Sequence, residues 1–262
     1  MAQSSTAKGG GIVELIKTIV YAVLLAGVIR TLLFQPFWIP SGSMKDTLLI
    51  GDFLFVNKYA YGYSKHSCPF SMCPFEGRIL AKMPKRGDVI VFTHPASGVV
   101  YIKRLIGLPG DRIQMKDGVL FINDTAAPQT PDAPFVEVME RQGPSGNRPH
   151  CSNAPVGRGA ECIKERATEQ LPDGPAHSVL NIADRDTDNT LVYTVPENHF
   201  FLMGDNRDNS QDSRIDRNRG GVGFVPFDNL VGRADRIMFS SAGRSILAFW
   251  TWRGDRFFKA IY

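Results

Sequence analysis

An almost uninterrupted apolar segment near the amino terminus constrains this chain more than any other feature. Between Ile12 and Phe34 the polar residues are Glu14, Lys17, Thr18, Arg30 and Thr31. A helix over this segment would be roughly 35 Å long at about 1.5 Å per residue, which is enough to cross a hydrocarbon core of about 30 Å. Pro36 is expected to end the helix. We therefore predict a transmembrane helix over residues 12–34, preceded by a short cytoplasmic tail over residues 1–11.

The flanks of the segment indicate how it is oriented. A cleaved secretory leader is the alternative, but no small-x-small cleavage site follows Ile29. Lys8 and Lys17 favour an amino terminus on the cytoplasmic side. Residues 35–262 would then form an extracytoplasmic domain held by an uncleaved anchor.

The sequence after residue 35 has the texture of strands and turns. β-branched and aromatic runs predict strands over residues 53–61, 87–92, 99–106, 199–203 and 229–239, and a hairpin within residues 112–123. Residues 124–190 are rich in Pro, Asp, Asn and Gly, so we expect a loop-rich insertion that forms at most a small subdomain. The predicted fold class is mainly β, with an antiparallel β-sheet domain on a single N-terminal transmembrane helix.

Four cysteines bear on the compartment in which the chain works. Cys68 and Cys73 lie in one loop-like region, and Cys151 and Cys162 lie in another. Two local disulfides are the simplest of the three possible pairings, and they would place the domain in an oxidising compartment. Four free thiols in a cytosolic protein are the alternative.

The charge pattern excludes one class of partner. The net charge is +4, and basic residues are interleaved with acidic ones, so we expect no binding of nucleic acid. A mild positive charge does suit work beside an anionic lipid bilayer. Near the carboxyl terminus aromatic residues alternate with cations, which suits a bilayer surface, although the same aromatics would also serve to complete a core: Phe249, Trp250, Trp252, Phe257 and Phe258.

The first stretch with chemical potential, F-W-I-P-S-G-S-M-K-D-T-L-L-I-G-D, runs from Phe37 to Asp52 directly after the apolar segment. Ser41 and Ser43 flank a glycine there, after the fixed backbone of Pro40. A serine presented in this way is a nucleophile only if another group removes its proton. A turn with solvent-facing hydroxyls is the plainer interpretation of this stretch alone.

The second stretch, Y-I-K-R-L-I, begins at Tyr101 and carries two adjacent cations on an apolar strand. Strand alternation places Lys103 and Arg104 on opposite faces. Desolvation and the charge of Arg104 would both lower the pKa of Lys103, and a neutral lysine is a general base. Two cations at a strand end, reaching out to water, are the alternative.

The third stretch is the dense polar run G-D-N-R-D-N-S-Q-D-S-R at residues 204–214. A calcium loop starting at Asp208 fails, because Ser213 stands where glycine is required and Arg219 where glutamate is required. A folded polar network that braces the two cations is the better interpretation. A Ser-His-Asp triad is disfavoured because none of the five histidines lies in a comparable motif and no G-x-S-x-G elbow is present.

Together, P-S-G-S-M at residues 40–44, Y-I-K-R-L-I-G-L-P-G-D at residues 101–111 and the run at residues 204–214 resemble the signature motifs of bacterial type I signal peptidases. The motifs and their flanking strands cover about half of the chain. The resemblance implies a Ser/Lys dyad protease that removes signal peptides from exported preproteins, after small-x-small sites such as Ala-x-Ala. It also implies a bacterial inner membrane location with the catalytic domain on the periplasmic side.

The resemblance assigns roles to the residues that match these motifs. It implies that Ser43 is the nucleophile, that Lys103 is the general base, and that the Ser41 side chain and the Ser43 N–H form the oxyanion hole. The implied supporting residues are Ser210, which should hydrogen-bond the Lys103 amine, with Asp212, Arg214, and Asp205 as the ion partner of Arg104. The positions implied to contact substrate are Phe37, Ile39, Pro40, Met44, Leu48, Tyr101 and Ile102.

Two features depart from the family pattern. Asp46 stands where many members have proline, and this chain shows one membrane segment where many members have two. Two other classes remain as alternatives: a membrane-tethered binding factor without catalysis, and a self-cleaving Ser/Lys regulator. Nothing in the sequence calls for a metal or an organic cofactor, and the sequence leaves the oligomeric state open.

Overall fold

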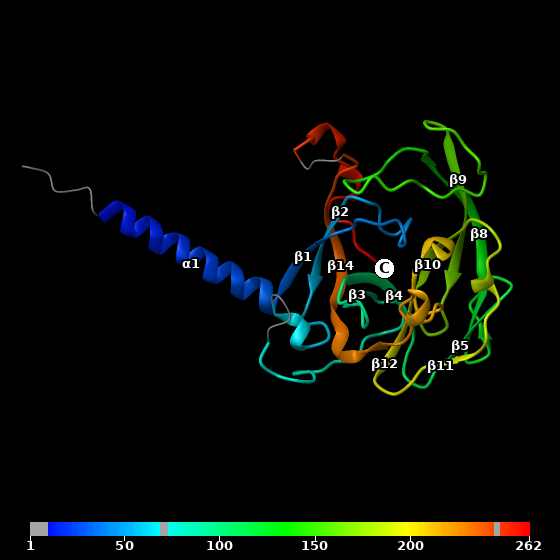
Figure 1. Cartoon of the computed structure of the whole chain (residues 1–262), viewed down its shortest axis with the longest axis horizontal. Helices are drawn as coiled ribbons and strands as arrows, with labels where there is room; N and C mark the ends of the chain where they lie inside the picture. Colours follow the sequence, from blue (N-terminus) through cyan, green and yellow to red (C-terminus); the bar gives the residue numbers. More distant parts are fainter. Residues whose placement is uncertain (1–9, 69–72, 244–246) are drawn as a thin grey trace, which may run out of the picture.

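The computed structural model describes residues 10–68, 73–243 and 247–262. Helix α1 (Gly10–Leu32) extends away from a β domain (Figure 1). Within these described ranges it is the one helix that is long and apolar enough to cross a membrane, and none of its apolar span is buried. Most of the predicted tail over residues 1–11 lies outside the described residues.

The helix ends earlier than predicted. It stops at Leu32, and Pro36 lies in strand β1 (Phe34–Trp38) instead of terminating the helix. Strand β1 is at the edge of its sheet, where proline is tolerated because its missing N–H need not face a partner strand. Helix α1 therefore continues almost directly into the β domain.

The main sheet has seven strands in the order β1-β2-β14-β3-β4-β12-β13, and the paired strands are antiparallel. Beyond β1, its strands are β2 (Asp52–Asn57), β3 (Val89–Thr93), β4 (Val100–Gly107), β12 (His199–Met203), β13 (Val225–Pro226) and β14 (Leu230–Ser240). The strands predicted over residues 53–61, 87–92, 99–106, 199–203 and 229–239 are confirmed as β2, β3, β4, β12 and β14, whereas β1 and β13 were not predicted. Strand β3 is buried along its whole length, as its uninterrupted apolar sequence requires.

A four-stranded sheet packs beside the main sheet, with its strands in the order β11-β5-β6-β7. They are β5 (Arg112–Lys116), β6 (Val119–Ile122), β7 (Thr125–Ala126) and β11 (Tyr193–Thr194), and β5 and β6 form the predicted hairpin. The apolar residues of this hairpin pack against Ile106, Phe201 and Met203 of the main sheet. The resulting core fixes the end of β4 that follows Lys103.

The insertion is more regular than predicted. It contains a three-stranded antiparallel sheet, in the order β10-β9-β8, on the side of the domain away from α1 (Figure 1). Its strands are β8 (Gln129–Val138), β9 (Glu161–Gln170) and β10 (Ala176–Asn181). Most of β8 is exposed on both faces, so its sequence lacks the apolar alternation by which a strand is recognised.

Both predicted disulfides are present. Cys68 is bonded to Cys73, and Cys151 is bonded to Cys162. The second bond ties the segment that follows β8 to the start of β9. Disulfides persist in oxidising compartments, so the pairing agrees with a domain outside the cytoplasm.

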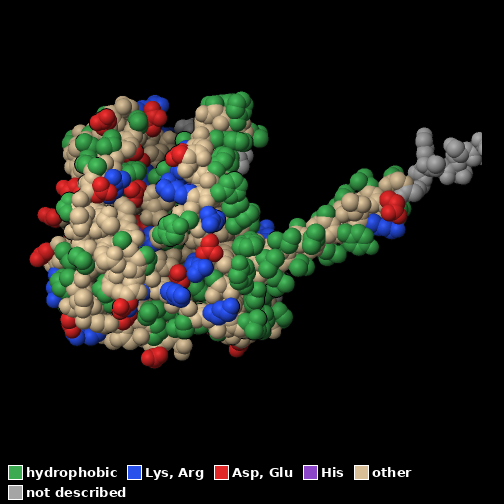
Figure 2. All heavy atoms as spheres, turned by 180° about the vertical axis from the view of Figure 1, so that it is seen from behind, with side chains coloured by type: hydrophobic (Ala, Val, Ile, Leu, Met, Phe, Trp, Pro, Cys, Tyr) green, Lys and Arg blue, Asp and Glu red, His purple; other side chains and the backbone are tan. Residues whose placement is uncertain are grey.

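Exposed apolar side chains continue from α1 onto the adjoining side of the domain (Figure 2). A row of aromatic contacts links the edge of the main sheet to the C-terminal segment: Trp38 to Phe53 at 5.6 Å between ring centroids, Phe53 to Phe239 at 5.7 Å, and Phe239 to Trp252 at 4.7 Å. In that segment Trp250 is 75% exposed, whereas Phe257 is half-buried against Phe239. The C-terminal aromatics are therefore divided between the surface and the core.

Candidate active site

Ser43 and Lys103, the residues expected to be nucleophile and general base, are in direct contact. Ser43 lies in the turn that follows β1, and Lys103 lies in the middle of β4. The Nζ of Lys103 is 2.7 Å from the Oγ of Ser43, and it also donates to the carbonyl oxygen of Ile102 at 3.1 Å. Both side chains are buried, with 7% of Ser43 and 4% of Lys103 exposed. A serine hydroxyl and a desolvated amine are thus in direct contact.

Burial sets the charge state of the lysine. Desolvation lowers the pKa of Lys103 to about 8, while Asp212 and Asp205 act in the opposite direction and Arg214 adds to the lowering. The expectation that the charge of Arg104 would lower the pKa of Lys103 is wrong, because the cation that lowers this pKa is Arg214. Arg104 lies on the opposite face of β4, where its charge is already matched.

Arg104 and Asp205 form the predicted ion pair. The guanidinium contacts both carboxylate oxygens, with Nε to Oδ1 at 2.8 Å and Nη2 to Oδ2 at 2.7 Å, and both side chains are almost fully buried. Thr47 donates to the same carboxylate at 2.6 Å, so the pair also contacts the segment after the nucleophile. Although burial alone would raise it, Arg104 holds the pKa of Asp205 below its usual range.

Asp212 and Arg214 form a second buried pair beside the lysine. Arg214 donates to both oxygens of Asp212 at 2.9 Å, and the backbone N–H of Gly204 donates to Asp212 at 3.0 Å. Ser210 differs from the expectation. Its buried Oγ makes no hydrogen bond to the Lys103 amine, so the expected bond is not formed; Ser210 instead acts with Arg214 to hold the pKa of Asp212, which burial alone would raise, below its usual range. Lys103 instead directs its donors to Ser43 and Ile102.

Asn206 holds the turn that contains Gly42 and Ser43, which we call the nucleophile turn. The sequence interpretation missed this role. The side chain of Asn206 donates to the carbonyl oxygen of Gly42 at 2.9 Å, and its backbone N–H donates to that of Ser43 at 3.1 Å. The position of this asparagine between Asp205 and Arg207, inside the polar run, was the available signal. The polar run at residues 204–214 therefore contacts the turn around Ser43 through Asn206, in addition to binding Arg104 of β4 through Asp205.

An apolar pocket of about 320 Å³ opens beside the two catalytic candidates. Its lining includes five of the predicted substrate-contacting residues, Phe37, Ile39, Pro40, Tyr101 and Ile102. The sequence interpretation missed the remaining wall, formed by Trp38, Val91, Val99, Val100, Asn209 and Gln211. Ser41, Ser43 and Lys103 lie at the same opening, so the Ser43 hydroxyl is beside an apolar surface.

Met44 and Leu48 do not line this pocket, contrary to the expectation. Both are buried in a core cluster with Ile39, Leu54 and Ile237. The turn after Ser43 directs these side chains into the core, where they anchor the segment that follows Ser43. Asp46, the departure from the family pattern, contacts Arg166 of β9 at 3.3 Å and so links the turn to the insertion.

Among the described residues, no histidine is hydrogen-bonded to Ser43 or to the Lys103 amine, which contacts Ser43 and Ile102. His177 is in β10 and not in a loop as expected, and it is buried 3.5 Å from Glu169 and 3.9 Å from Asp205. Burial lowers the pKa of His177 to about 4, so this side chain is neutral at ordinary pH. His94 closes its own turn by accepting from the N–H groups of Ala96 and Ser97.

The fold and the site define a class of protein: a β-sheet serine hydrolase in which a buried lysine amine contacts the candidate serine. The sequence profile described as "Signal peptidase, peptidase S26" matches residues 12–239. The chain belongs to this family, and it is an endopeptidase of the signal peptidase I type.

Similar proteins carry the same description. The signal peptidase I of Rickettsia typhi is 40% identical over 232 residues, which are 84% of this chain and 78% of that protein. The signal peptidase I of Rickettsia massiliae is 40% identical over 233 residues, 85% of this chain and 77% of that protein. A solved structure of a signal peptidase I from Enterococcus faecalis is 24% identical, with a TM-score of 0.30, over 58% of this chain and 97% of that one.

Proposed function

We propose that this chain removes N-terminal signal peptides from exported preproteins with Ser43 as nucleophile and Lys103 as general base. The observation that carries the proposal is the 2.7 Å contact between the Lys103 amine and the Ser43 hydroxyl inside a desolvated site. An amine with a pKa of about 8 is neutral in a useful fraction of molecules near neutral pH, whereas a solvated lysine is not.

The steps follow from this geometry. Neutral Lys103 takes the hydroxyl proton as the Ser43 oxygen forms a bond to the carbonyl carbon of the substrate. The Ser41 hydroxyl and the Ser43 N–H then donate to the oxyanion that develops on the carbonyl oxygen. The Lys103 ammonium gives its proton to the departing amine as the carbon–nitrogen bond breaks. Lys103 next takes a proton from water as the water oxygen attacks the acyl ester. The bond from the carbonyl carbon to the Ser43 oxygen then breaks, and Lys103 returns the proton to Ser43.

The apolar pocket supports a preference for small side chains before the cleaved bond. Tyr101 and Ile102 of β4 and Phe37 and Ile39 of β1 present a shallow apolar wall beside Ser43. Alanine-sized side chains fit such a wall without burying a polar group, whereas charged residues would lose hydration there without gaining a partner. A small-x-small site with residues such as Ala-x-Ala is the corresponding substrate pattern.

The placement of the protein is part of the proposal. Helix α1 would anchor the chain in the bacterial inner membrane, with the disulfide-bonded domain on the periplasmic side. The exposed aromatic surface that adjoins α1 would rest against the lipid bilayer (Figure 2). Tyrosine and tryptophan favour the interfacial region, because their rings are apolar and their polar atoms remain hydrated.

The test uses the full-length protein in detergent with a preprotein that carries an Ala-x-Ala site. We expect a shortened product whose new amino terminus follows that site, and we expect no product with Ser43→Ala or Lys103→Ala. The double variant should be little worse than either single one, because the two residues act as a unit. A folded protein that binds the preprotein and leaves it intact would instead indicate a binding factor.

A further inference from the structure

A second hollow, of about 130 Å³, adjoins the nucleophile turn and plays no part in the steps described above. Ser41, Ser43 and Asn209 line both this hollow and the apolar pocket, so the two meet at the nucleophile. Lys103 lines only the apolar pocket, whereas ten of the thirteen residues that line the second hollow are polar or charged. We name it the polar hollow. Its remaining lining residues are Gly42, Lys45, Ile50, Glu137, Asn147, Arg148, Pro149, His150, Lys164 and Asn206.

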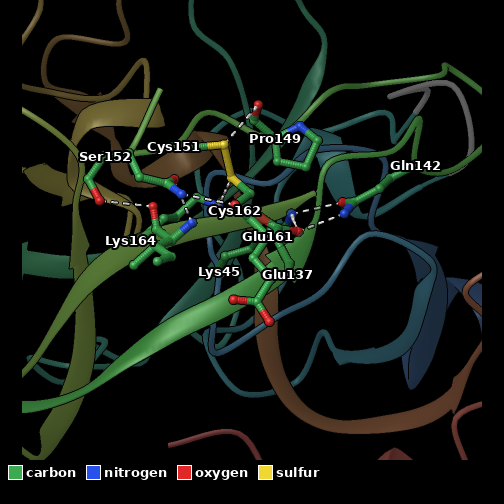
Figure 3. Close-up of a disulfide and its surroundings, with 11 residues drawn as sticks. Lys45, Glu137, Gln142, Pro149, Cys151, Ser152, Glu161, Cys162 and Lys164 are labelled. Carbon is green, nitrogen blue, oxygen red and sulfur yellow. Dashed lines mark hydrogen bonds and ion pairs between the residues drawn. A yellow bond between two sulfur atoms is a disulfide. The ribbon is translucent and has the colours of Figure 1, made fainter. Parts of the chain in front are cut away.

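The insertion builds the outer wall of the polar hollow. Gln142 and Asn147 close a turn through backbone hydrogen bonds of 2.8 and 3.1 Å. The Asn147 side chain donates to the carbonyl oxygen of Pro40 at 2.7 Å, so this turn touches the entry to the nucleophile turn. The Cys151–Cys162 disulfide holds the segment after the turn to β9, close to Pro149 and Lys164 (Figure 3). The wall is therefore fixed at both ends.

The floor of the polar hollow is a buried charge cluster. Glu137 accepts from Lys45 at 2.5 Å, from the side chain of Gln142 at 2.6 Å, and from Lys164 (Figure 3). Its two oxygens are thus already engaged by three donors. Three cations, Lys45, Lys164 and Arg148, line the hollow, and Glu137 is the one acidic residue among the lining residues that the structure describes. The hollow therefore has a net positive charge.

A substrate across Ser43 extends in two directions from the bond that is cleaved. If the residues before the bond occupy the apolar pocket, as proposed above, the residues after the bond reach the hollow on the other side of the shared turn. We infer that the polar hollow receives the first residues of the released chain and favours an acidic residue over a basic one there. This inference rests on the proposed function, and it gives the insertion a part in substrate selection.

The test compares three preproteins that differ only in the first residue after the cleaved bond, which is Glu, Gln or Lys. With the full-length enzyme in detergent, kcat/KM should be highest for Glu and lowest for Lys. Neighbouring steps should differ by about two- to fivefold, as expected for partly exposed charge pairs. The difference should shrink at high salt, because solvent-exposed charges are screened. The same charges placed well downstream should have no effect.

Charge reversal at the rim gives the matched enzyme variants. Arg148 is exposed and lines the hollow, and Arg148→Glu would leave two cations and two acidic residues there, so kcat/KM should become nearly equal for the Glu and Lys preproteins. Arg158 is also exposed but lies outside the hollow, and Arg158→Glu should keep the wild-type order. Equal cleavage of all three preproteins by the wild type, independent of salt, would overturn the inference and leave the proposed function standing. No cleavage of any preprotein would overturn both.

Discussion

The α-carbon of Gly204 lies so close to Ser43 that a β-carbon at position 204 would be 2.6 Å from the Ser43 carbonyl oxygen and 2.3 Å from the Ser210 hydroxyl. The glycine that opens the third motif is therefore required by contact and not by backbone conformation. It lets the polar run pass directly behind the nucleophile, where Asn206 then holds the turn.

Gly204→Ala should accordingly impair catalysis. The added methyl group would displace the backbone of Ser43, and a misplacement of about 1 Å is enough to cost about a hundredfold in rate. We expect kcat to fall by at least tenfold in a protein that still folds. Gly157→Ala is the control, because no atom lies near its added methyl group. Wild-type rates with Gly204→Ala would show that the nucleophile turn is not fixed in this way.

The pH dependence of cleavage should follow Lys103. The base must be neutral, and its pKa is lowered by burial to about 8. In the free enzyme, kcat/KM should therefore rise by about tenfold per pH unit below that value and level off above it. Lys103→Arg should be inactive at every pH, since a guanidinium keeps its proton. A flat profile, or activity lost on replacing one histidine in a folded protein, would mean that another group is the base.

Burial of Lys103 should lower the free energy of unfolding of the protein. The pKa of this lysine is lowered in the folded protein, so between about pH 8 and 10.5 the unfolded chain binds more protons and wild-type stability rises with pH. Below pH 8 the full penalty applies, and Lys103→Met should raise the free energy of unfolding by about 1–3 kcal/mol. The gain should vanish as the pH approaches 10.5. Chemical unfolding followed by tryptophan fluorescence measures both. Lys164→Met is the contrast, because it would strip a partner from buried Glu137 and destabilise the fold.

The Arg104–Asp205 pair should be sensitive to the loss of either partner. Arg104→Met leaves a fully buried carboxylate without its counterion, which costs about 3–5 kcal/mol. The exposed pair between Arg112 and Asp124 offers the comparison, and Arg112→Met should cost less than about 1 kcal/mol. Unfolding by denaturant compares the two variants directly. Equal losses would show that Asp205 is solvated or has another partner.

The aromatic surface should touch lipid. The three tryptophans of the chain, Trp38, Trp250 and Trp252, all lie along or beside the row of aromatic contacts. In liposomes made with brominated lipids, tryptophan fluorescence of the full-length protein should be quenched. The quenching should weaken with Trp250→Phe, which removes the most exposed of these indoles. Emission that is the same in brominated and ordinary lipids would place this surface in water.

Local patterns in the sequence were sufficient for the helix and for seven of the fourteen strands in the described residues, whereas the roles of Ser43 and Lys103 were expected from the family resemblance. Alternation placed Lys103 and Arg104 on opposite faces of β4, and the uninterrupted apolar run identified β3. Patterns failed where a side chain's direction depended on distant packing. The family resemblance implied that Met44 and Leu48 contact substrate, yet the turn after Ser43 directs both side chains into the core.

The insertion shows a second kind of limit. Strand β8 is solvated on both faces, so nothing in its sequence distinguishes it from a loop until β9 pairs with it. The cation that adds to the lowering of the Lys103 pKa is Arg214, and its nearness to β4 depends on how the polar run folds back. The expected hydrogen bond between Ser210 and the Lys103 amine was also beyond sequence patterns, because the partner of a hydroxyl depends on distances of a few tenths of an ångström.

The short connection from α1 to the nucleophile has a kinetic consequence. The helix ends at Leu32 and the nucleophile turn follows one five-residue strand, so even a fully extended chain allows at most about 40 Å between Leu32 and Ser43. With α1 in the bilayer as proposed, the enzyme would meet a membrane-embedded preprotein by diffusion in two dimensions. Its turnover in a cell would then depend on how many enzyme and preprotein molecules share each unit of membrane area.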